Sequence, residues 1–310
     1  RADITPQVAR IATTRLRGAP RPLRLSYAGQ ILRVKGTQLR ADRQFGQVGV
    51  ELIGAVTPVA DAEIILMAAK VLNELGVENM SVDLCLPTLV PAVCRDLGLS
   101  AAKEASIRAA LDGKDAAGIT ALSDSIGEDN AALFSSLLAA TGQAQDTLGA
   151  LETMNLGAAA REEFYSLKAV VDVLNTEAPD LVLTVDVVEN RGWEYHTGVT
   201  FTFFTRGVRG ELGAGGRYGT SDEDSDNGIE PATGLTLFMD TLLRAIPAGD
   251  TARRIYLPLG TPREQGEILR SEGWVTVPGL ESETDNTQEA VRLGCDYMMI
   301  DGKPQAVTST

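Results

Sequence analysis

The chain has 310 residues and a formal net charge of −14, from 42 acidic and 28 basic side chains. A surface this acidic repels a phosphate backbone at long range, so we expect no nucleic-acid partner. The three cysteines, Cys85, Cys94 and Cys295, form no CxxC pair, which argues against a zinc site and a secreted disulfide framework. The length suits one large domain with an appendage or two domains. With no long apolar run and no signal-like start, the sequence predicts a soluble cytoplasmic protein without membrane association.

Basic residues are concentrated near the start of the sequence, although the chain as a whole is acidic. This local excess predicts either a place that holds an anion or a carboxylate, or a solvated basic loop, and composition does not separate the two. The residues concerned are Arg1, Arg10, Arg15, Arg17, Arg21, Arg24, Arg33, Lys35, Arg40 and Arg43.

The first part of the chain combines strand and helix patterns. Polar–apolar alternation over residues 22–34 and 44–55 predicts an antiparallel hairpin with a polar inward face that could form the floor of a site. An amphipathic helix is expected over residues 60–76 and a strand over residues 79–86. From about residue 87 to 175 the sequence is rich in Ala and Leu at helical spacing, which predicts a helical insertion.

Strand patterns return after the insertion, at residues 181–188 and 198–205 and at the glycine-rich residues 210–219. We therefore expect an antiparallel sheet to resume there. Residues 231–246 have the pattern of an amphipathic helix, and residues 247–253 that of a linker.

The remaining sequence alternates strand and helix patterns and predicts a small α/β unit. The expected division is thus into residues 1–250 and 251–310. The acidic segment 221–228 lacks the glycine and glutamate register of an EF-hand loop, so no metal site is expected.

Four short segments, taken in order, resemble the class II aminoacyl-tRNA synthetase core, and in particular histidyl-tRNA synthetase. They are "RADITP" at residues 1–6, "LRVK" with "RQFGQVGVELIG" up to residue 54, "RGWEYHTG" at residues 191–198 and "GAGGRY" at residues 213–218. The resemblance implies an α+β fold, with an antiparallel sheet, flanking helices, a helical insertion and a small C-terminal α/β unit. It also implies that the dimer-forming motif 1 of the family precedes Arg1.

The same resemblance implies a pocket for free histidine. Asp3, Thr5 and Gln47 would hold the α-ammonium group, and Arg191 and Arg33 the carboxylate side. Glu51, Tyr195 and His196 would hold the imidazole ring, and Tyr218 completes the predicted site. Gln47 and Glu51 are four residues apart, which places both on one face of a strand; without the other motifs, a polar outer sheet face explains them better.

His196, the only histidine of the chain, has two interpretations. Taken alone, it fits an ordinary packed or surface histidine better than a ligand or a catalyst. Within the resemblance, it takes the position of a second tyrosine in the family's ligand pocket, and its contact there is not fixed by the pattern.

Other residues depart from the family's ATP-binding motifs. Lys35 stands where motif 2 has Glu, Thr241 where motif 3 has the ATP-binding Arg, and Phe238 where motif 3 has a glycine that leaves room. Removing one transition-state contact costs about 3–4 kcal/mol, so the sequence predicts no amino-acid activation.

A chain that keeps the histidine pocket but lacks the residues that bind ATP and tRNA is similar to the regulatory subunits of short-form ATP phosphoribosyltransferase. This implies a catalytically inert, dimeric histidine sensor in a hetero-oligomer with the short catalytic subunit, working without a cofactor. The alternatives are histidyl-tRNA synthetase or a related histidine-activating ligase, and a degenerate ATP-binding synthetase with an unrelated partner.

Overall fold

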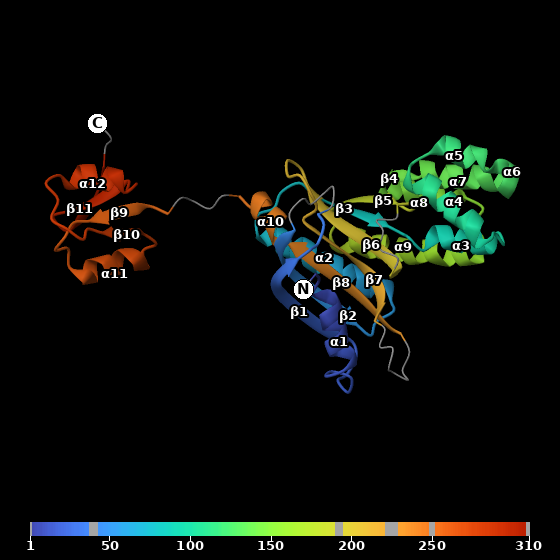
Figure 1. Cartoon of the computed structure of the whole chain (residues 1–310), viewed down its shortest axis with the longest axis horizontal. Coiled ribbons are helices and arrows are strands. Elements are labelled where there is room, and N and C mark those ends of the chain that lie inside the picture. The colour runs from blue at the N-terminus through green and yellow to red at the C-terminus, as the bar shows by residue number, and fades with distance from the viewer. Residues whose placement is uncertain (1, 37–42, 190–194, 221–228, 248–251, 308–310) are drawn as a thin grey trace. The chain divides into compact units, whose positions relative to one another are not determined.

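The computed structural model describes residues 2–36, 43–189, 195–220, 229–247 and 252–307. The chain divides into two compact units, residues 1–247 and residues 248–310 (Figure 1). All the described residues of the predicted site belong to the first unit.

An eight-stranded sheet forms the centre of the first unit, in the order β1-β2-β8-β7-β6-β3-β5-β4. Neighbouring strands are antiparallel except β3 and β5, which are parallel. The strands are β1 (Leu23–Leu32), β2 (Gln44–Ile53), β3 (Met80–Cys85), β4 (Thr141–Gln143), β5 (Val182–Asp186), β6 (His196–Thr205), β7 (Gly213–Thr220) and β8 (Glu230–Phe238).

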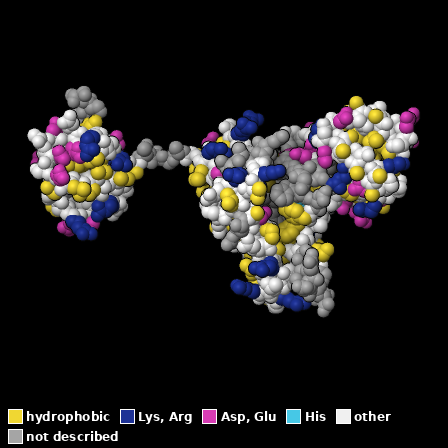
Figure 2. Space-filling model, in the orientation of Figure 1, with side chains coloured by type: hydrophobic (Ala, Val, Ile, Leu, Met, Phe, Trp, Pro, Cys, Tyr) yellow, Lys and Arg dark blue, Asp and Glu magenta, His cyan; other side chains and the backbone are white. Residues whose placement is uncertain are grey.

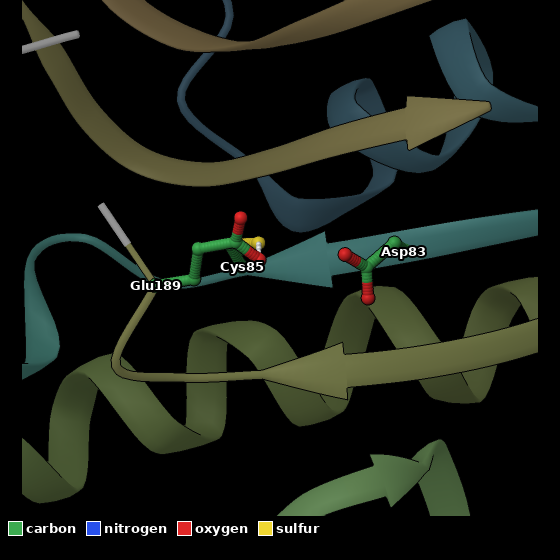
Figure 3. A group of neighbouring side chains, drawn as sticks. All are labelled: Asp83, Cys85 and Glu189. Carbon is green, nitrogen blue, oxygen red and sulfur yellow. Dashed lines mark hydrogen bonds between the residues drawn. The ribbon is translucent and has the colours of Figure 1, made fainter. Parts of the chain in front are cut away.

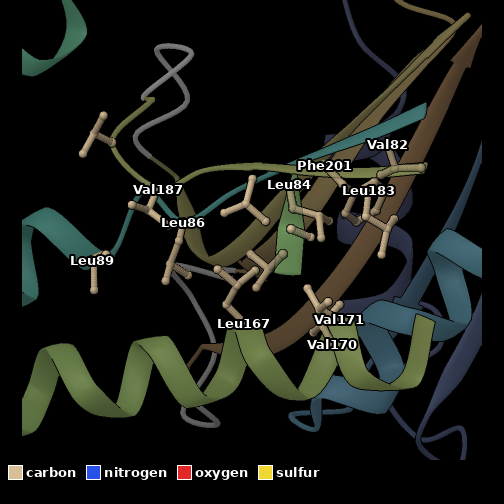
Figure 4. Packing of buried hydrophobic residues seen from close by; sticks show 14 of the residues in the cluster. Val82, Leu84, Leu86, Leu89, Leu167, Val170, Val171, Leu183, Val187 and Phe201 are labelled. Carbon is tan, nitrogen blue, oxygen red and sulfur yellow. The ribbon is translucent and has the colours of Figure 1, made fainter. Parts of the chain in front are cut away.

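Helices cover both faces of this sheet. One face carries α1 (Thr5–Thr13), which packs on β1 and β2, and the other carries α2 (Pro58–Glu74) and α9 (Ala158–Glu177). The main core lies under α2 and α9. In Figure 4, Leu167, Val170 and Val171 of α9 point at Leu84 and Phe201 of the sheet. Burial of large aliphatic and aromatic side chains stabilises this layer by about 1.5–3 kcal/mol per side chain.

The parallel pair of β3 and β5 follows from the helical segment between them, because parallel strands need a long crossover connection. That crossover consists mainly of helices and ends with α9. Its other elements are α3 (Leu89–Asp96), α4 (Ala101–Asp112), α5 (Ala116–Ala121), α6 (Ser123–Ile126), α7 (Glu128–Ala139), the short strand β4 and α8 (Ala144–Thr153).

The prediction of one helix over residues 231–246 is wrong. Residues 230–238 form the central strand β8, and only α10 (Met239–Ala245) is helical. From Ala232 to Phe238 every residue of β8 is buried. A strand covered on both faces loses its polar–apolar alternation, so its apolar pattern does not distinguish it from a buried helix.

The second unit has a four-stranded sheet in the order β10-β9-β11-β12. Its elements are β9 (Arg254–Leu257), α11 (Arg263–Ser271), β10 (Val275–Pro278), α12 (Asn286–Arg292), β11 (Tyr297–Ile300) and β12 (Lys303–Ala306). The first three strands are parallel, and β12 adds an antiparallel edge that the sequence pattern did not indicate.

The surface of the first unit carries its basic residues unevenly. Figure 2 shows Lys and Arg side chains around α1 and the segment that follows it, where Arg10, Arg15 and Arg17 are exposed. Arg21 and Arg24, by contrast, pair with Glu230 and Glu63. Most of the basic excess near the start of the sequence is therefore solvated or paired.

Two further general expectations concern the cysteines and the membrane. All three cysteines are buried and none forms a disulfide. Burial raises the pKa of the Cys94 thiol to about 11. Among the described helices, none has the length and apolarity needed to cross a bilayer.

Candidate ligand-binding site

A cavity of about 100 Å³ opens on the sheet face that carries α1. Eight of the nine residues predicted for the histidine site line it, namely Asp3, Thr5, Arg33, Gln47, Glu51, Tyr195, His196 and Tyr218. The ninth, Arg191, lies outside the described residues, as does the acidic segment 221–228.

Gln47 and Glu51 form the deepest polar part of the cavity. Both side chains are 1% exposed and lie on the same face of β2, as their spacing predicts. Burial of an amide and a carboxyl at neighbouring positions is unfavourable unless each finds a hydrogen-bond partner. Gln47 Oε1 accepts a hydrogen bond from the Ile4 backbone N–H at 3.2 Å, which ties the start of α1 to β2.

Glu51 receives a hydrogen bond from Tyr218 of β7, whose hydroxyl lies 2.8 Å from Oε2. Burial raises the pKa of Glu51 to about 7, although hydrogen bonds from Tyr218, Thr5 and Tyr27 act in the opposite direction. Burial and the neighbouring Glu51 also raise the pKa of Tyr218 above its usual range, so this phenol stays a donor.

The residues before and at the start of α1 are fixed by a chain of hydrogen bonds. Asp3 Oδ1 accepts from the backbone N–H groups of Ile4 at 2.7 Å and Thr5 at 3.2 Å. Thr5 Oγ1 lies 3.0 Å from the Tyr27 hydroxyl, which in turn lies 2.6 Å from Thr236 Oγ1. This chain connects α1 to β1 and β8 across the cavity floor.

An aromatic cluster forms one side of the cavity. The rings of Tyr195 and His196 are stacked, with centroids 4.3 Å apart and planes 29° apart. Tyr195 also meets Tyr218 edge to face at 6.1 Å. His196 is therefore part of the cavity wall, beside the tyrosine that binds Glu51.

The residues that depart from the ATP-binding motifs, Phe238, Thr241 and Lys35, lie in different environments. Phe238 lines the cavity and packs edge to face against Phe45, with centroids 5.8 Å apart. The Arg33 guanidinium lies over the other ring of this pair, 5.2 Å from the Phe45 centroid. Thr241 is 1% exposed and Lys35 is exposed, and neither lines the cavity.

Glycines make the room for the cavity. A Cβ on Gly234 of β8 would lie 1.7 Å from Glu51 Oε2, and one on Gly216 of β7 would lie 3.0 Å from His196 Cδ2. Both positions pair directly across β7 and β8. The Glu51 and His196 side chains therefore occupy space that is free because two facing positions carry no side chain.

Sequence reasoning missed several residues of the site. Glu211 and Thr236 line the cavity, and Tyr27 supports it from β1. Tyr27 continues the alternation of its strand, so its pattern matches an ordinary inward-facing residue. No pattern marks Glu211, which precedes β7 in a connecting segment.

A second polar group lies further along the same sheet face. The atoms of Asp83, Cys85 and Glu189 that could ligate a metal ion, two carboxylate oxygens and one Sγ, lie within 4.8 Å of one another (Figure 3). Hydrogen bonds account for part of this arrangement, since Cys85 Sγ donates to Glu189 Oε2 at 3.9 Å and Thr184 Oγ1 donates to Asp83 Oδ1 at 2.9 Å. The group neighbours the cavity through Thr202, which pairs with Asp83 across β6 and β3.

The described cavity residues present a definite charge pattern. Three carboxyl groups, on Asp3, Glu51 and Glu211, accompany one guanidinium, on Arg33. Such a lining suits a small zwitterion that carries at least one ammonium group and an N–H donor, because each end then meets a group of opposite polarity.

The chain is similar to proteins of a known family. A family model described as histidyl-tRNA synthetase matches residues 1–242. Two curated relatives are named ATP phosphoribosyltransferase regulatory subunit. The one from Rhodospirillum centenum is 50% identical over 307 residues, covering 99% of this chain and 77% of the relative. The one from Paramagnetospirillum magneticum is 51% identical over 299 residues, covering 96% and 76%.

Solved structures share the fold. A protein from Bacillus halodurans described as an ATP phosphoribosyltransferase regulatory subunit/histidyl-tRNA synthetase aligns with a TM-score of 0.76 at 23% identity, over 94% of this chain and 77% of that one. A chain of an ATP phosphoribosyl transferase complex from Thermotoga maritima aligns with a TM-score of 0.59 at 19% identity, over 77% and 80%. The predicted class II synthetase-like α+β fold is confirmed, and the chain belongs to the family of ATP phosphoribosyltransferase regulatory subunits.

Proposed function

We propose that this chain binds free histidine in the cavity on β2, β7 and β8 and conveys feedback inhibition to a short-form ATP phosphoribosyltransferase catalytic subunit, whose activity requires it. The observation that carries the proposal is the convergence of eight predicted residues on one cavity with a buried carboxyl at its floor. Asp3 and Gln47 lie beside each other for the α-ammonium group, Arg33 supplies a cation for the carboxylate, and Glu51 with Tyr218 faces the ring.

The proposed assembly is a homodimer of this chain within a hetero-oligomer with the catalytic subunit. Association with a catalytic subunit is supported by the family name and by the chain of similar fold in an ATP phosphoribosyl transferase complex. A ligand held by a subunit without chemistry of its own acts by preferring one state of the complex. Linkage then requires that the catalytic subunit change the affinity for histidine by the same factor.

The test is a comparison of Gln47→Ala with Gln44→Ala, which removes the same side chain from an exposed position on the same strand. Each variant is titrated with histidine by calorimetry and assayed with the catalytic subunit at graded histidine. We expect Gln47→Ala alone to raise the inhibitory histidine concentration about tenfold while activation persists, because a group buried in the site loses its hydrogen bonds.

Two results would count against this function. Absence of any histidine binding to the parent chain would remove the assignment of the cavity. Inhibition that stays unchanged in Gln47→Ala, despite weakened binding, would place the feedback site on the catalytic subunit.

A further inference from the structure

Glu51 is a buried carboxyl group, and none of the described residues that contact it carries a positive charge. Tyr218 faces it from β7, Tyr27 from β1, and Asp3 and Thr5 from the start of α1. Tyr195 and His196 stand at the rim before and at the start of β6, and Arg33 and Glu211 complete the charged lining of the cavity. The hydroxyls can donate to the carboxylate, but burial and the negative charge of Asp3 oppose its ionisation.

The ring of a bound histidine brings a second titratable group into this space. A free imidazole has a pKa of about 6.5, and Glu51 in the unliganded protein has a pKa of about 7. Two such groups placed in contact titrate as a pair rather than separately. A cationic ring against a desolvated carboxylate is a charge-assisted pair, which is about twice as strong as a neutral hydrogen bond.

Binding is less favourable when Glu51 and the ligand ring together carry two protons or none. With two protons, a neutral Glu51 faces a cationic ring and the charge-assisted pair is lost. With none, Glu51 is a buried carboxylate that meets a neutral ring, so no charge on the ligand ring offsets its desolvation.

We propose that Glu51 and the ring of the bound ligand hold a single proton between them, so that the site selects amino acids with a basic ring and binds them best near neutral pH. This inference rests on the proposed function, since it takes the cavity to be the histidine site. It assigns to Glu51 a role in specificity through the basicity of the ligand, beyond the shape of the ring.

The proton balance fixes the pH dependence. Below pH 6 both Glu51 and free histidine are protonated, and one proton must leave on binding; above pH 7.5 neither is protonated, and one must be taken up. With pKa values of about 6.5 and about 7, affinity should be greatest near pH 6.8 and about fivefold weaker at both pH 5.5 and pH 8.0.

The experiment is calorimetric titration of the full chain with histidine at these three pH values, each in two buffers of different ionisation enthalpy. We expect release of close to one proton per site at about pH 5.5, uptake of close to one at about pH 8.0, and no net exchange near pH 6.8. β-(Pyrazol-3-yl)alanine is the matched ligand, because it keeps the N–H donor and the ring size but has a ring that is not basic at these pH values. Its affinity should decline only at the alkaline end.

Glu51→Gln supplies the matched variant, and Glu74→Gln, at an exposed position on α2, supplies the control. The first should lose proton uptake at pH 8.0, and the second should behave as the parent. If histidine binds at no pH, the proposed function fails. If it binds with an affinity that is flat from pH 7 to pH 8 and without proton uptake, the cavity holds histidine but the shared proton is wrong.

Discussion

Folding buries Glu51 before any ligand arrives, so the unliganded protein carries the free-energy cost of that burial. The cost depends on pH because the folded chain binds a proton at Glu51 more tightly than the unfolded chain does. The pKa rises from 4.5 to about 7, so the free energy of unfolding falls as pH increases through that interval.

Glu51→Gln should remove this dependence. We expect the stability of the variant relative to the parent to increase by about 3 kcal/mol between pH 4.5 and pH 8 in the absence of histidine. Urea unfolding of both proteins at the two pH values measures the change. An equal difference at both values would show that Glu51 titrates normally in the folded chain.

Arg217 and Tyr218 are adjacent in the sequence but serve different purposes. Tyr218 points into the cavity, whereas Arg217 makes a buried ion pair with Asp61 of α2, with Nη2 2.8 Å from Oδ2. It also donates to the carbonyl oxygens of Ala55 and Thr57 at 3.0 and 2.8 Å. The "GGRY" segment thus combines an internal crosslink with a ligand-facing residue.

At the scale of elements, Arg217 joins β7 to the start of α2. Arg217→Met should lower the free energy of unfolding by about 3–5 kcal/mol, because Asp61 is fully buried and would keep, among the side chains that the structure describes, only its bond from Thr233. Adding Asp61→Asn should recover part of that loss. A double variant as unstable as the sum of the single variants would indicate that the two side chains act independently.

Arg33, Phe45 and Phe238 pack together at the cavity, where Arg33 lies over the Phe45 ring and Phe238 meets that ring edge to face. Since Phe238 lines the cavity, at a position where the sequence resemblance implies a glycine in the synthetases, and Thr241 is buried in α10, we expect no histidine-dependent ATP–pyrophosphate exchange. Exchange above a blank without protein, in an assay calibrated with a histidyl-tRNA synthetase, would restore the enzyme interpretation.

The extent of successful prediction differs between elements for physical reasons. β2 was predictable because its alternation and the spacing of Gln47 and Glu51 are local properties of one strand. β8 was not, because its apolar character reflects cover from both faces, which only the folded sheet supplies. Tyr27 and Glu211 belong to the site only through contacts between distant segments, so no local pattern could mark them.

At the scale of the whole molecule, the two units have separate cores. The described lining of the cavity comes entirely from residues before Pro247. A chain that ends at Pro247 should therefore fold and, on the proposed function, bind histidine within about twofold of the affinity of the 310-residue chain. Calorimetry on both forms tests this; a tenfold loss in the shortened chain would show that the second unit supports the site.

The helical insertion is tied to the sheet near the cavity. Lys114, two residues after α4, pairs with Asp186 at the end of β5, and Asp186 also accepts from the backbone N–H groups of Val188 and Glu189. Glu189 accepts a hydrogen bond from Cys85 of β3, so these contacts connect the insertion to the sheet face that carries the cavity.

Single-nucleotide changes at the two facing glycines, Gly216 and Gly234, can disrupt the site. One nucleotide change converts a glycine codon to an alanine codon, and at Gly234 the added methyl group would occupy the place of the Glu51 carboxylate. Such an allele would alter none of the side chains that meet the ligand. On the proposed function, selection for cells that overproduce histidine should therefore recover substitutions at Gly216 and Gly234, which carry no side chain, as well as at Glu51 and Gln47.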